Sequence, residues 1–273
     1  MNVGIIGLGV VGGSIAKALK AAQPSIRLVG IEKVDEIRGE ACTSGLFDEI
    51  HHTIVDQLNA VDVIFVCVPL EIVERVFKRL DQILTSPKII SDVTGIKTPI
   101  VKLANTYLSE HLHIGTHPMA GGQKGGFSNA RADKFADAVV AICQDTESNN
   151  GAVKTITDLW RSMGARPLVM SPQEHDETVA TTSHLPYLIA ITLTEHAHSP
   201  DAPELAGGSY RDATLRADFA PEIMAPILGE NAFLPATVKK FAARLLELSD
   251  ILEKNPEEFS RRASEARNQR KSS

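Results

Sequence analysis

Up to residue 172, short apolar runs alternate with longer stretches in which apolar residues recur at helical spacing. The apolar runs predict strands, and they span residues 2–7, 26–31, 61–68, 89–90, 113–116, 139–143 and 167–170. The stretches with helical spacing predict helices, and they include residues 15–22, 71–84, 99–108 and 151–163. Strands that alternate with helices are typical of a parallel, doubly wound sheet that helices cover on both faces.

Beyond this point the pattern changes, because no further β-like run occurs. Residues 174–198 predict one long helix, and the chain after it reads as helices separated by Gly and Pro breaks. Residues 255–273 are charged and polar, as in a solvated terminal helix that frays. The sequence therefore predicts an α/β domain over residues 1–172 and an all-helical domain over residues 173–273.

A glycine-rich turn, Gly7-x-Gly9-x-x-Gly12, separates the first predicted strand from the first predicted helix. In this context the glycines allow a tight turn, close approach to a pyrophosphate, and close packing of helix on strand. The helix N-terminus then offers free N–H groups to the phosphates. The α/β domain is therefore predicted to be a Rossmann-type dinucleotide-binding domain. The residues expected to contact the cofactor here are Gly7, Leu8, Gly9, Val10, Val11 and Gly12.

Glu32 ends the second predicted strand, about twenty residues beyond the last glycine of the motif. A carboxylate at this place accepts hydrogen bonds from the ribose hydroxyls of NAD and repels the 2′-phosphate of NADP. NAD is therefore the expected cofactor rather than NADP. Lys33, the next residue, is a cation that could meet a phosphate and weakens this preference.

Composition and charge exclude several classes of partner. The 273 residues carry a formal net charge of −6, so no overall basic field favours nucleic acid or acidic lipid. No apolar run of about eighteen residues occurs, so we expect no membrane span. The three cysteines are too scattered for a disulfide framework or a metal knuckle, and no metal site is predicted. We expect a cytoplasmic protein.

The stretch GTHPMAGGQKGGF, residues 115–127, holds five glycines and predicts a loop. His117 in this loop follows a predicted strand, and strand ends of such sheets face the cofactor. Imidazole accepts a proton near neutral pH, which suits removal of a hydroxyl proton while hydride leaves the same carbon. The alternative for His117 is a solvated histidine in a surface loop.

The chain resembles a known family, the prephenate/arogenate (cyclohexadienyl) dehydrogenases of tyrosine biosynthesis. The resemblance runs from the first strand to beyond residue 212 and covers most of the chain. The matching segments are GLGVVGGS (7–14), VP (68–69), DVTGIK (92–97), THPMAG (116–121), DLWRSMG (158–164), HD (175–176), SHLP (183–186) and GGSYRD (207–212). The order of THPMAG, HD and SHLP makes the resemblance highly specific.

The resemblance implies oxidative decarboxylation of a cyclohexadienyl carboxylate with NAD. Hydride passes from ring C4 to NAD, CO2 leaves, and prephenate gives 4-hydroxyphenylpyruvate or arogenate gives tyrosine. His117 matches the family histidine that accepts the proton of the ring hydroxyl. The resemblance also implies a homodimer formed by the helical domain. It adds cofactor contacts at Val68, Pro69, Thr94 and Gly95.

The chain departs from the family pattern at several places. Gly95 stands where the family has a serine that hydrogen-bonds the catalytic histidine, and Thr94 is the hydroxyl expected to replace it. The family's substrate-clamping arginine falls on Leu215, which leaves Arg211 or Arg216 for that part. The residues expected to bind substrate are Gln123, Lys124, Ser183, His184, Tyr187, Arg211 and Arg216.

Structural alternatives stay open for several of these residues. Lys124, in a glycine-rich stretch, is as readily a solvated lysine. For SHLP the alternative is a helix kink at Pro186 with a histidine satisfied in the core, and the substrate pocket is the favoured interpretation. His175-Asp176 stands at a helix start, where capping by Ser171 or Asp176 is at least as strong an interpretation as catalysis. Two other classes of protein share this architecture: β-hydroxyacid or imine-type dehydrogenases with a catalytic lysine or aspartate, and non-catalytic dinucleotide sensors.

Overall fold

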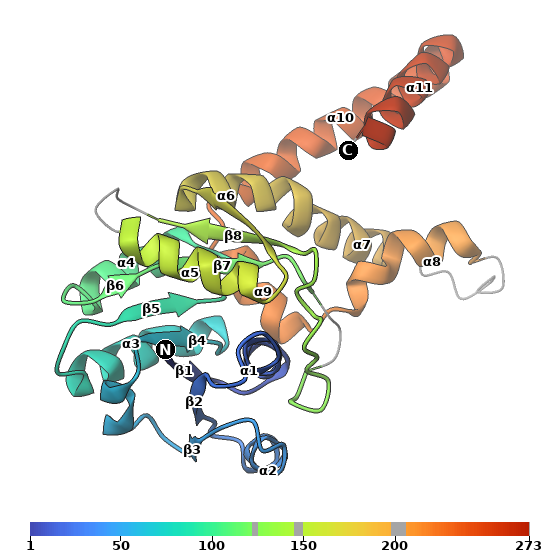
Figure 1. Cartoon of the computed structure of the whole chain (residues 1–273). Helices are drawn as coiled ribbons and strands as arrows, with labels where there is room; N and C mark the ends of the chain where they lie inside the picture. Colours follow the sequence, from blue (N-terminus) through green and yellow to red (C-terminus); the bar gives the residue numbers. More distant parts are fainter. Residues whose placement is uncertain (122–124, 145–149, 198–205, 273) are drawn as a thin grey trace.

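The computed structural model describes residues 1–121, 125–144, 150–197 and 206–272. Its first domain contains a six-stranded sheet with the order β3-β2-β1-β4-β5-β6, in which all neighbouring strands are parallel (Figure 1). The strands are β1 (Asn2–Ile6), β2 (Arg27–Ile31), β3 (Glu49–His51), β4 (Val63–Val66), β5 (Ile89–Asp92) and β6 (Leu112–His113). The predicted parallel, doubly wound sheet is therefore confirmed. Strand β3 was not predicted.

Two buried apolar clusters lie on the two faces of this sheet. Successive residues of β4 alternate between them, since Phe65 belongs to one cluster and Ile64 and Val66 belong to the other. Helices α1 and α5 contribute to the first cluster, and α3 and α4 to the second. The helices of this domain are α1 (Val10–Ala22), α2 (Asp35–Thr43), α3 (Leu70–Ile83), α4 (Thr98–Tyr107) and α5 (Asn150–Ser162), with the 3-10 helix η1 (Asp56–Ala60). Burial on both faces explains why these strands read as continuous apolar runs.

A second, three-stranded sheet corrects the prediction of a single parallel sheet. It contains β7 (Gly115–Pro118), β8 (Val139–Cys143) and β9 (Arg166–Met170), and β7 runs antiparallel to β8. The predicted strand 113–116 is divided at Ile114, because β6 pairs with β5 while β7 pairs with β8. The prediction of a loop from residue 115 is also wrong at its start, since His117 and Pro118 belong to β7.

The first helix after β9, α6, begins at Pro172. Within the described residues beyond it there is no strand, as predicted. The elements from Pro172 onward are α6 (Pro172–Val179), the π-helical turn η3 (Ala180–His184), α7 (Leu185–His196), α8 (Gly208–Thr214), the 3-10 helix η5 (Leu215–Asp218), α9 (Pro221–Gly229), α10 (Leu234–Lys254) and α11 (Pro256–Ser272). The single long helix predicted for residues 174–198 is therefore interrupted by a π turn just before Pro186. A proline cannot donate to a carbonyl in the preceding turn, which favours such an irregularity.

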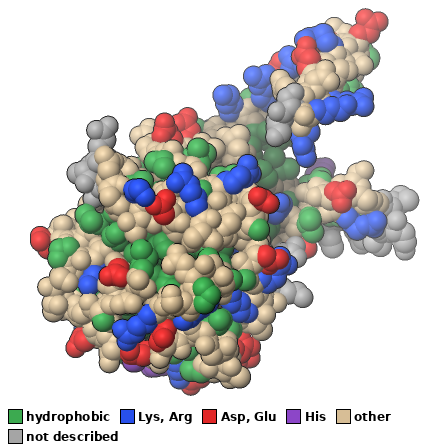
Figure 2. Space-filling view, in the orientation of Figure 1, with side chains coloured by type: hydrophobic (Ala, Val, Ile, Leu, Met, Phe, Trp, Pro, Cys, Tyr) green, Lys and Arg blue, Asp and Glu red, His purple; other side chains and the backbone are tan. Residues whose placement is uncertain are grey.

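Helices α10 and α11 form a hairpin that projects from the rest of the molecule (Figure 1). Basic side chains gather along this hairpin in Figure 2. Arg262 of α11 bridges Glu247 of α10 and Glu258, at 2.6 and 3.2 Å, and fixes the two helices together. In the described part of the chain, every helix is too short or too polar to span a membrane.

Candidate active site

The glycine motif forms a turn in which side chains are sterically excluded at two positions. Gly7 has a φ of 89°, and a Cβ there would lie 2.4 Å from the carbonyl oxygen of Cys67. A Cβ on Gly12 would lie 1.9 Å from the carbonyl oxygen of Gly7. A Cβ on Gly9 would meet no atom within 4 Å, so this glycine faces open space at the start of α1. The turn therefore presents bare backbone and a helix N-terminus, which is the arrangement that binds a pyrophosphate.

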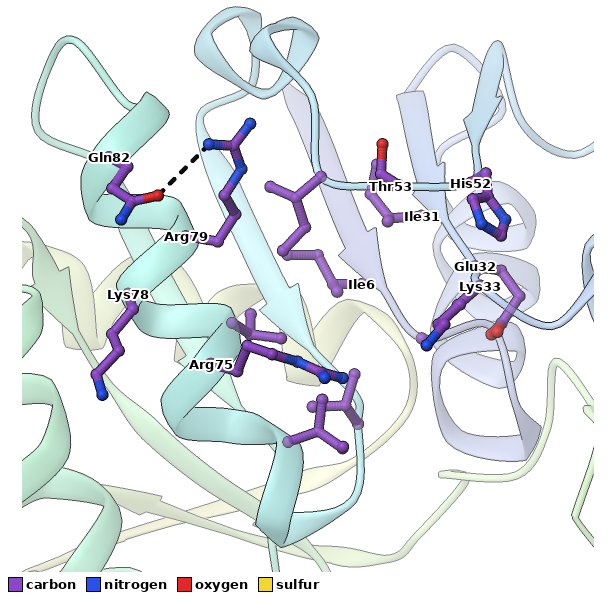
Figure 3. Close-up of a pocket in the computed structure, with 15 residues that line it drawn as sticks. Ile6, Ile31, Glu32, Lys33, His52, Thr53, Arg75, Lys78, Arg79 and Gln82 are labelled. Carbon is purple, nitrogen blue, oxygen red and sulfur yellow. Dashed lines mark hydrogen bonds between the residues drawn. The ribbon is translucent and has the colours of Figure 1, made fainter.

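Beside this turn, at the carboxyl ends of β1 and β2, lies a cavity of about 660 Å³ (Figure 3). Gly7, Glu32 and Val68, all predicted to contact the cofactor, line it. The Glu32 carboxylate accepts hydrogen bonds from the backbone N–H of Leu8 (2.7 Å) and of Val34 (2.8 Å). These two bonds fix the carboxylate where the ribose of a dinucleotide lies in this fold.

The same cavity holds a group of basic side chains that was not predicted. Figure 3 shows Arg75 and Arg79 of α3 across the opening from Glu32 and Lys33. The further polar residues of the lining are His52, Thr53, Lys78 and Gln82. The signal was present in the sequence, because Arg75, Lys78 or Arg79, and Gln82 recur at the spacing of one helix face. The cavity therefore combines one carboxylate with several cations.

His117 lies at the start of a chain of hydrogen bonds that joins the two domains. Its Nδ1 is 2.9 Å from Nε2 of His175, and Nδ1 of His175 is 2.7 Å from Oδ1 of Asp176. His175 and Asp176 are buried, whereas His117 is partly exposed. The predicted alternative of capping also holds: Ser171 is the N-cap of α6, and it forms a capping box with Glu174. The sequence therefore showed the cap but not the contact between the two histidines.

Asp176 also accepts two backbone N–H groups from the other domain. The N–H of Lys97 lies 2.8 Å from Oδ1, and the N–H of Thr98 lies 2.8 Å from Oδ2. These groups are at the N-terminus of α4, so the carboxylate occupies a helix N-terminus that has no side-chain cap of its own. Burial opposes ionisation of Asp176, but hydrogen bonds from His175, Thr98 and Lys97 hold its pKa below the ordinary value. Asp176 is therefore ionised at neutral pH.

The surroundings of His117 disfavour its protonated form. Burial lowers its pKa well below the ordinary value, and the positive charge of Lys97 lowers the pKa further, whereas the charge of Asp92 acts in the opposite direction. The position of a Cβ on Gly95 is 3.8 Å from Nε2 of His117. The imidazole is thus neutral near pH 7, with Nδ1 bound to His175 and Nε2 on the side of Gly95. This is the state that a general base needs.

Thr94 does not take the place of the family serine. Its hydroxyl oxygen lies 2.6 Å from Oδ2 of Asp92 and 2.8 Å from the carbonyl oxygen of Ile96. Both contacts belong to the turn after β5, so the hydroxyl stabilises that turn instead of contacting His117. The prediction that Thr94 is the hydroxyl partner of the base is therefore corrected.

Asp92 itself is the centre of a second buried polar group. Its carboxylate contacts the ammonium of Lys97 and lies 3.0 Å from Nε2 of His113. Lys97 also donates to the carbonyl of Thr116 at 2.6 Å, next to His117 in β7. Burial alone would raise the pKa of Asp92, but Lys97 and His113 keep it far below the ordinary value. The strand that carries His117 is thus fixed to β5 by a buried ion pair. Sequence reasoning had not assigned Asp92 or Lys97 a role.

Three of the predicted substrate residues lie on the π turn and α7. Ser183 is partly exposed, whereas His184 and Tyr187 are buried. Nδ1 of His184 is 3.0 Å from the side-chain nitrogen of Asn231, which also donates to the carbonyl of Asp176 at 2.9 Å. His184 therefore supports the segment that carries His175 and Asp176.

The two candidate arginines differ in their surroundings. Both are exposed, but Arg211 donates to the carbonyl of Ala206 at 3.0 Å. The guanidinium of Arg216 lies over the ring of Phe219, 5.4 Å from its centroid. That ring lies 3.8 Å from the position of a Cβ on Gly121, in the segment that follows His117. Phe219 therefore places Arg216 near the segment that follows His117. Two other predicted residues, Gln123 and Lys124, lie outside the described residues.

The other predicted cofactor residues are not part of the cavity lining. Val10 and Val11 begin α1, and Pro69 precedes α3. In the described residues there is no group of three His, Cys, Asp or Glu side chains that could hold a metal ion.

The fold and this site define a two-domain dehydrogenase with a Rossmann-type nucleotide-binding domain. Two family models match the chain: the nucleotide-binding domain of prephenate dehydrogenase at residues 15–169, and its dimerization domain at residues 171–263. The chain belongs to the prephenate dehydrogenase family. This membership favours a prephenate or arogenate dehydrogenase over a β-hydroxyacid or imine-type dehydrogenase and over a non-catalytic dinucleotide sensor.

Individual relatives agree with the family match. The chain is 31% identical to a cyclohexadienyl dehydrogenase of Zymomonas mobilis over 85% of its own length and 81% of the relative. It is 30% identical to a prephenate dehydrogenase of Bacillus subtilis, of which it spans 63%. A crystal structure of prephenate dehydrogenase from A. aeolicus, in complex with hydroxyphenyl propionate and NAD+, is 25% identical. It superposes with a TM-score of 0.91, covering 100% of this chain and 98% of that one.

Proposed function

We propose that this protein catalyses the NAD-dependent oxidative decarboxylation of prephenate to 4-hydroxyphenylpyruvate or of arogenate to tyrosine. The observation that carries the proposal is the placement of His117, with Nδ1 2.9 Å from His175 and Nε2 on the side of Gly95, in surroundings that lower its pKa. The names of the relatives support this substrate class. The glycine turn and Glu32 support a dinucleotide as the second reactant.

The proposed role of His117 is proton transfer. When NAD+ is bound, its nicotinamide accepts the hydride that leaves ring C4. Nε2 of His117 takes the proton of the C4 hydroxyl as the C4–O bond becomes a carbonyl. The ring carboxylate then leaves as CO2. The electron pair of the broken C–C bond makes the ring aromatic, and His117 returns the proton to the phenolate oxygen. General-base catalysis of this kind contributes about 10²–10⁴-fold to the rate.

We assign the substrate-clamping function to Arg216. Phe219 holds its guanidinium on the side of Gly121, whereas Arg211 is bound to a carbonyl near the start of α8. A guanidinium binds a carboxylate through two parallel hydrogen bonds, which suits the carboxylates of this substrate class. Direct contacts of substrate with Ser183, His184 and Tyr187 stay predictions.

Glu32 supports a preference for NAD over NADP. Its carboxylate is fixed by two backbone N–H groups at the ribose position, where it would repel a 2′-phosphate. The cations of the same cavity would attract that phosphate. We therefore propose that Glu32 is the group that makes this cavity prefer NAD, against the pull of the cations.

We also propose that the protein forms a homodimer through its helical domain. Leu245, Leu246 and Leu252 of α10 are 59%, 70% and 56% exposed in a single chain. Large apolar side chains that remain exposed on a projecting hairpin are typical of a protein–protein interface. Sedimentation analysis of Leu246→Glu should show dissociation compared with the unchanged protein. The domain boundary at residue 172 and a cytoplasmic location stay predictions.

The decisive experiment measures NADH formation with prephenate and with arogenate in separate reactions. Identification of 4-hydroxyphenylpyruvate or tyrosine as the product then shows which substrate the protein uses. Formation of NADH with neither compound, under conditions in which NAD+ binding is shown independently, would overturn the proposed function.

A further inference from the structure

We propose that Asp176 is a positioning residue that acts through His175 to keep the proton of His117 on Nδ1 and the lone pair on Nε2. The proposal deepens the proposed function, on which its catalytic meaning rests. It concerns the tautomer of the base, a property of the free protein that can be measured without any reaction. The three side chains come from β7 and α6 and depend on the N-terminus of α4.

The direction of the hydrogen bonds starts at Asp176. An ionised carboxylate can only accept, and the N–H groups of Lys97 and Thr98 can only donate to it. The pKa of Asp176 is held low by these same bonds, so the carboxylate is ionised when it meets His175. Nδ1 of His175, 2.7 Å from Oδ1, must therefore carry a proton.

With His175 neutral, the direction of the hydrogen bonds continues from His175 to His117. A neutral imidazole with its proton on Nδ1 has a lone pair on Nε2. This Nε2 lies 2.9 Å from Nδ1 of His117, and the rings meet edge to face at 68° with centroids 5.1 Å apart. His117 must then donate from Nδ1, which leaves Nε2 as its proton acceptor.

The opposite arrangement would inactivate the base. A protonated His175 would donate from both ring nitrogens, and His117 would then accept at Nδ1 and carry its proton on Nε2. The same reversal follows if His175 turns away from Asp176. The carboxylate therefore determines which nitrogen of His117 is available for the substrate hydroxyl, as a carboxylate does when it accepts a hydrogen bond from a histidine bound to a metal ion.

The arrangement also makes the state of the base depend on contact between the domains. His117 belongs to β7, while His175 and Asp176 belong to the first helix of the helical domain. The same carboxylate binds the N-terminus of α4 in the nucleotide-binding domain. The tautomer of His117 is therefore fixed only when α6 packs against the N-terminus of α4.

The test uses ¹⁵N-histidine NMR of the full-length protein without substrate. The chemical shifts of the two ring nitrogens distinguish the Nδ1–H and Nε2–H tautomers, and the resonances missing in His117→Asn assign His117. We expect the Nδ1–H tautomer in the unchanged protein. In His175→Phe, which has no acceptor, we expect the population to move toward Nε2–H and kcat to fall at least about 10-fold.

A conservative variant separates positioning from packing. In His175→Gln, the amide can donate to Asp176 and accept from His117, so we expect the Nδ1–H tautomer and much of kcat to be retained. Asp176→Asn offers one oxygen to three donors and should give mixed tautomers, provided circular dichroism shows a folded protein. If that variant does not fold, the two His175 variants carry the test.

The outcomes distinguish this inference from the proposed function. An Nε2–H tautomer at His117 in the unchanged protein, or retention of Nδ1–H and of kcat in His175→Phe, would overturn the inference even if NADH forms. The expected tautomers together with no turnover of prephenate or arogenate would leave the inference standing and overturn the function.

Discussion

Ile227 of α9 lies against Gly95 in the turn after β5. A Cβ at position 95 would be 3.2 Å from Cδ1 and 3.3 Å from Cγ2 of this isoleucine. The same position is next to Nε2 of His117. A side chain of the helical domain therefore occupies space that the resemblance assigns to a serine, and it covers the base from one side.

This packing predicts a coupling between positions 95 and 227. Gly95→Ala should lower the free energy of unfolding by about 1 kcal/mol, because Ile227 must move to admit a methyl group. Ile227→Val alone should cost about 0.5–1.5 kcal/mol. In the double variant the cost of the alanine should shrink, which urea titrations of all four proteins would show. Strictly additive costs would mean that the two residues do not restrict each other.

His117→Asn should bind NAD+ normally and lose turnover by about 10²–10⁴-fold, since asparagine fills similar space but cannot accept the hydroxyl proton. Steady-state rates and calorimetric titration with NAD+ would measure the two effects. The exposed His196 offers a matched control, and His196→Asn should keep both activity and cofactor affinity. Equal loss of activity in both variants would argue against a specific role for His117.

Glu32→Gln should shift cofactor preference toward NADP. The amide keeps the size of the side chain but removes the charge that repels a 2′-phosphate, while Lys33 and Arg75 remain in the cavity. The ratio of kcat/KM for NAD to that for NADP should fall by about 10-fold or more, since one charge at such a site is worth about 1.4 kcal/mol or more. Adding Lys33→Gln to this variant should reverse part of the shift in preference toward NADP. An unchanged ratio would show that other residues determine the choice.

Arg216→Lys should raise KM for the carboxylate substrate by about 10-fold, because an ammonium cannot make the paired hydrogen bonds of a guanidinium. Arg211→Lys is the matched control and should change KM little, since Arg211 is bound to a backbone carbonyl. A larger effect at Arg211 would reverse the assignment.

The protein should lose stability as the pH falls through the weakly acidic range. Burial lowers the pKa of His184 from 6.5 to about 4. Between these values the unfolded chain binds a proton that the folded protein does not, so the contribution of His184 is complete above about pH 6.5 and is lost on the way to pH 4. The loss is on the order of 3 kcal/mol. His117, whose pKa is also lowered, acts in the same direction.

Urea titrations at pH 7.5 and at pH 5 would measure this difference. His184→Gln should reduce the dependence on pH, whereas the exposed His196→Gln should leave it unchanged. The lowered pKa values of Asp92 and Asp176 do not interfere, because ionised carboxyl groups stabilise the fold down to lower pH. Equal stability at the two pH values would contradict the assignment of this loss to the lowered pKa of His184.

Local sequence patterns were sufficient for the features that depend on a few neighbouring residues. The glycine turn, Glu32 and the change to helices after Pro172 each follow from short-range rules about backbone freedom and periodicity. The division of residues 113–118 between two sheets could not be predicted. Strand β6 has two residues, and the partner of β7 is β8, more than twenty residues further along the chain.

The contact between His117 and His175 was out of reach for a similar reason. The two residues are 58 positions apart and belong to different domains, so only the tertiary fold brings them together. Thr94 shows the converse error. Thr94 is next in sequence to Gly95, where the family has a serine, but the Thr94 hydroxyl binds Asp92 within the turn. Nearness along the chain is a weak guide to which polar groups meet.

The π turn at Ala180–His184 has a consequence for how the helical domain tolerates change. It accommodates one residue more than a regular helix would, and each residue turns the following helix by about 100°. Deleting a single residue here would rotate all of α7 relative to α6 without shortening any loop. Substitutions at many surface positions of this domain are compatible with the fold. An insertion or deletion at this junction would instead rotate the packing face of α7 away from its partners.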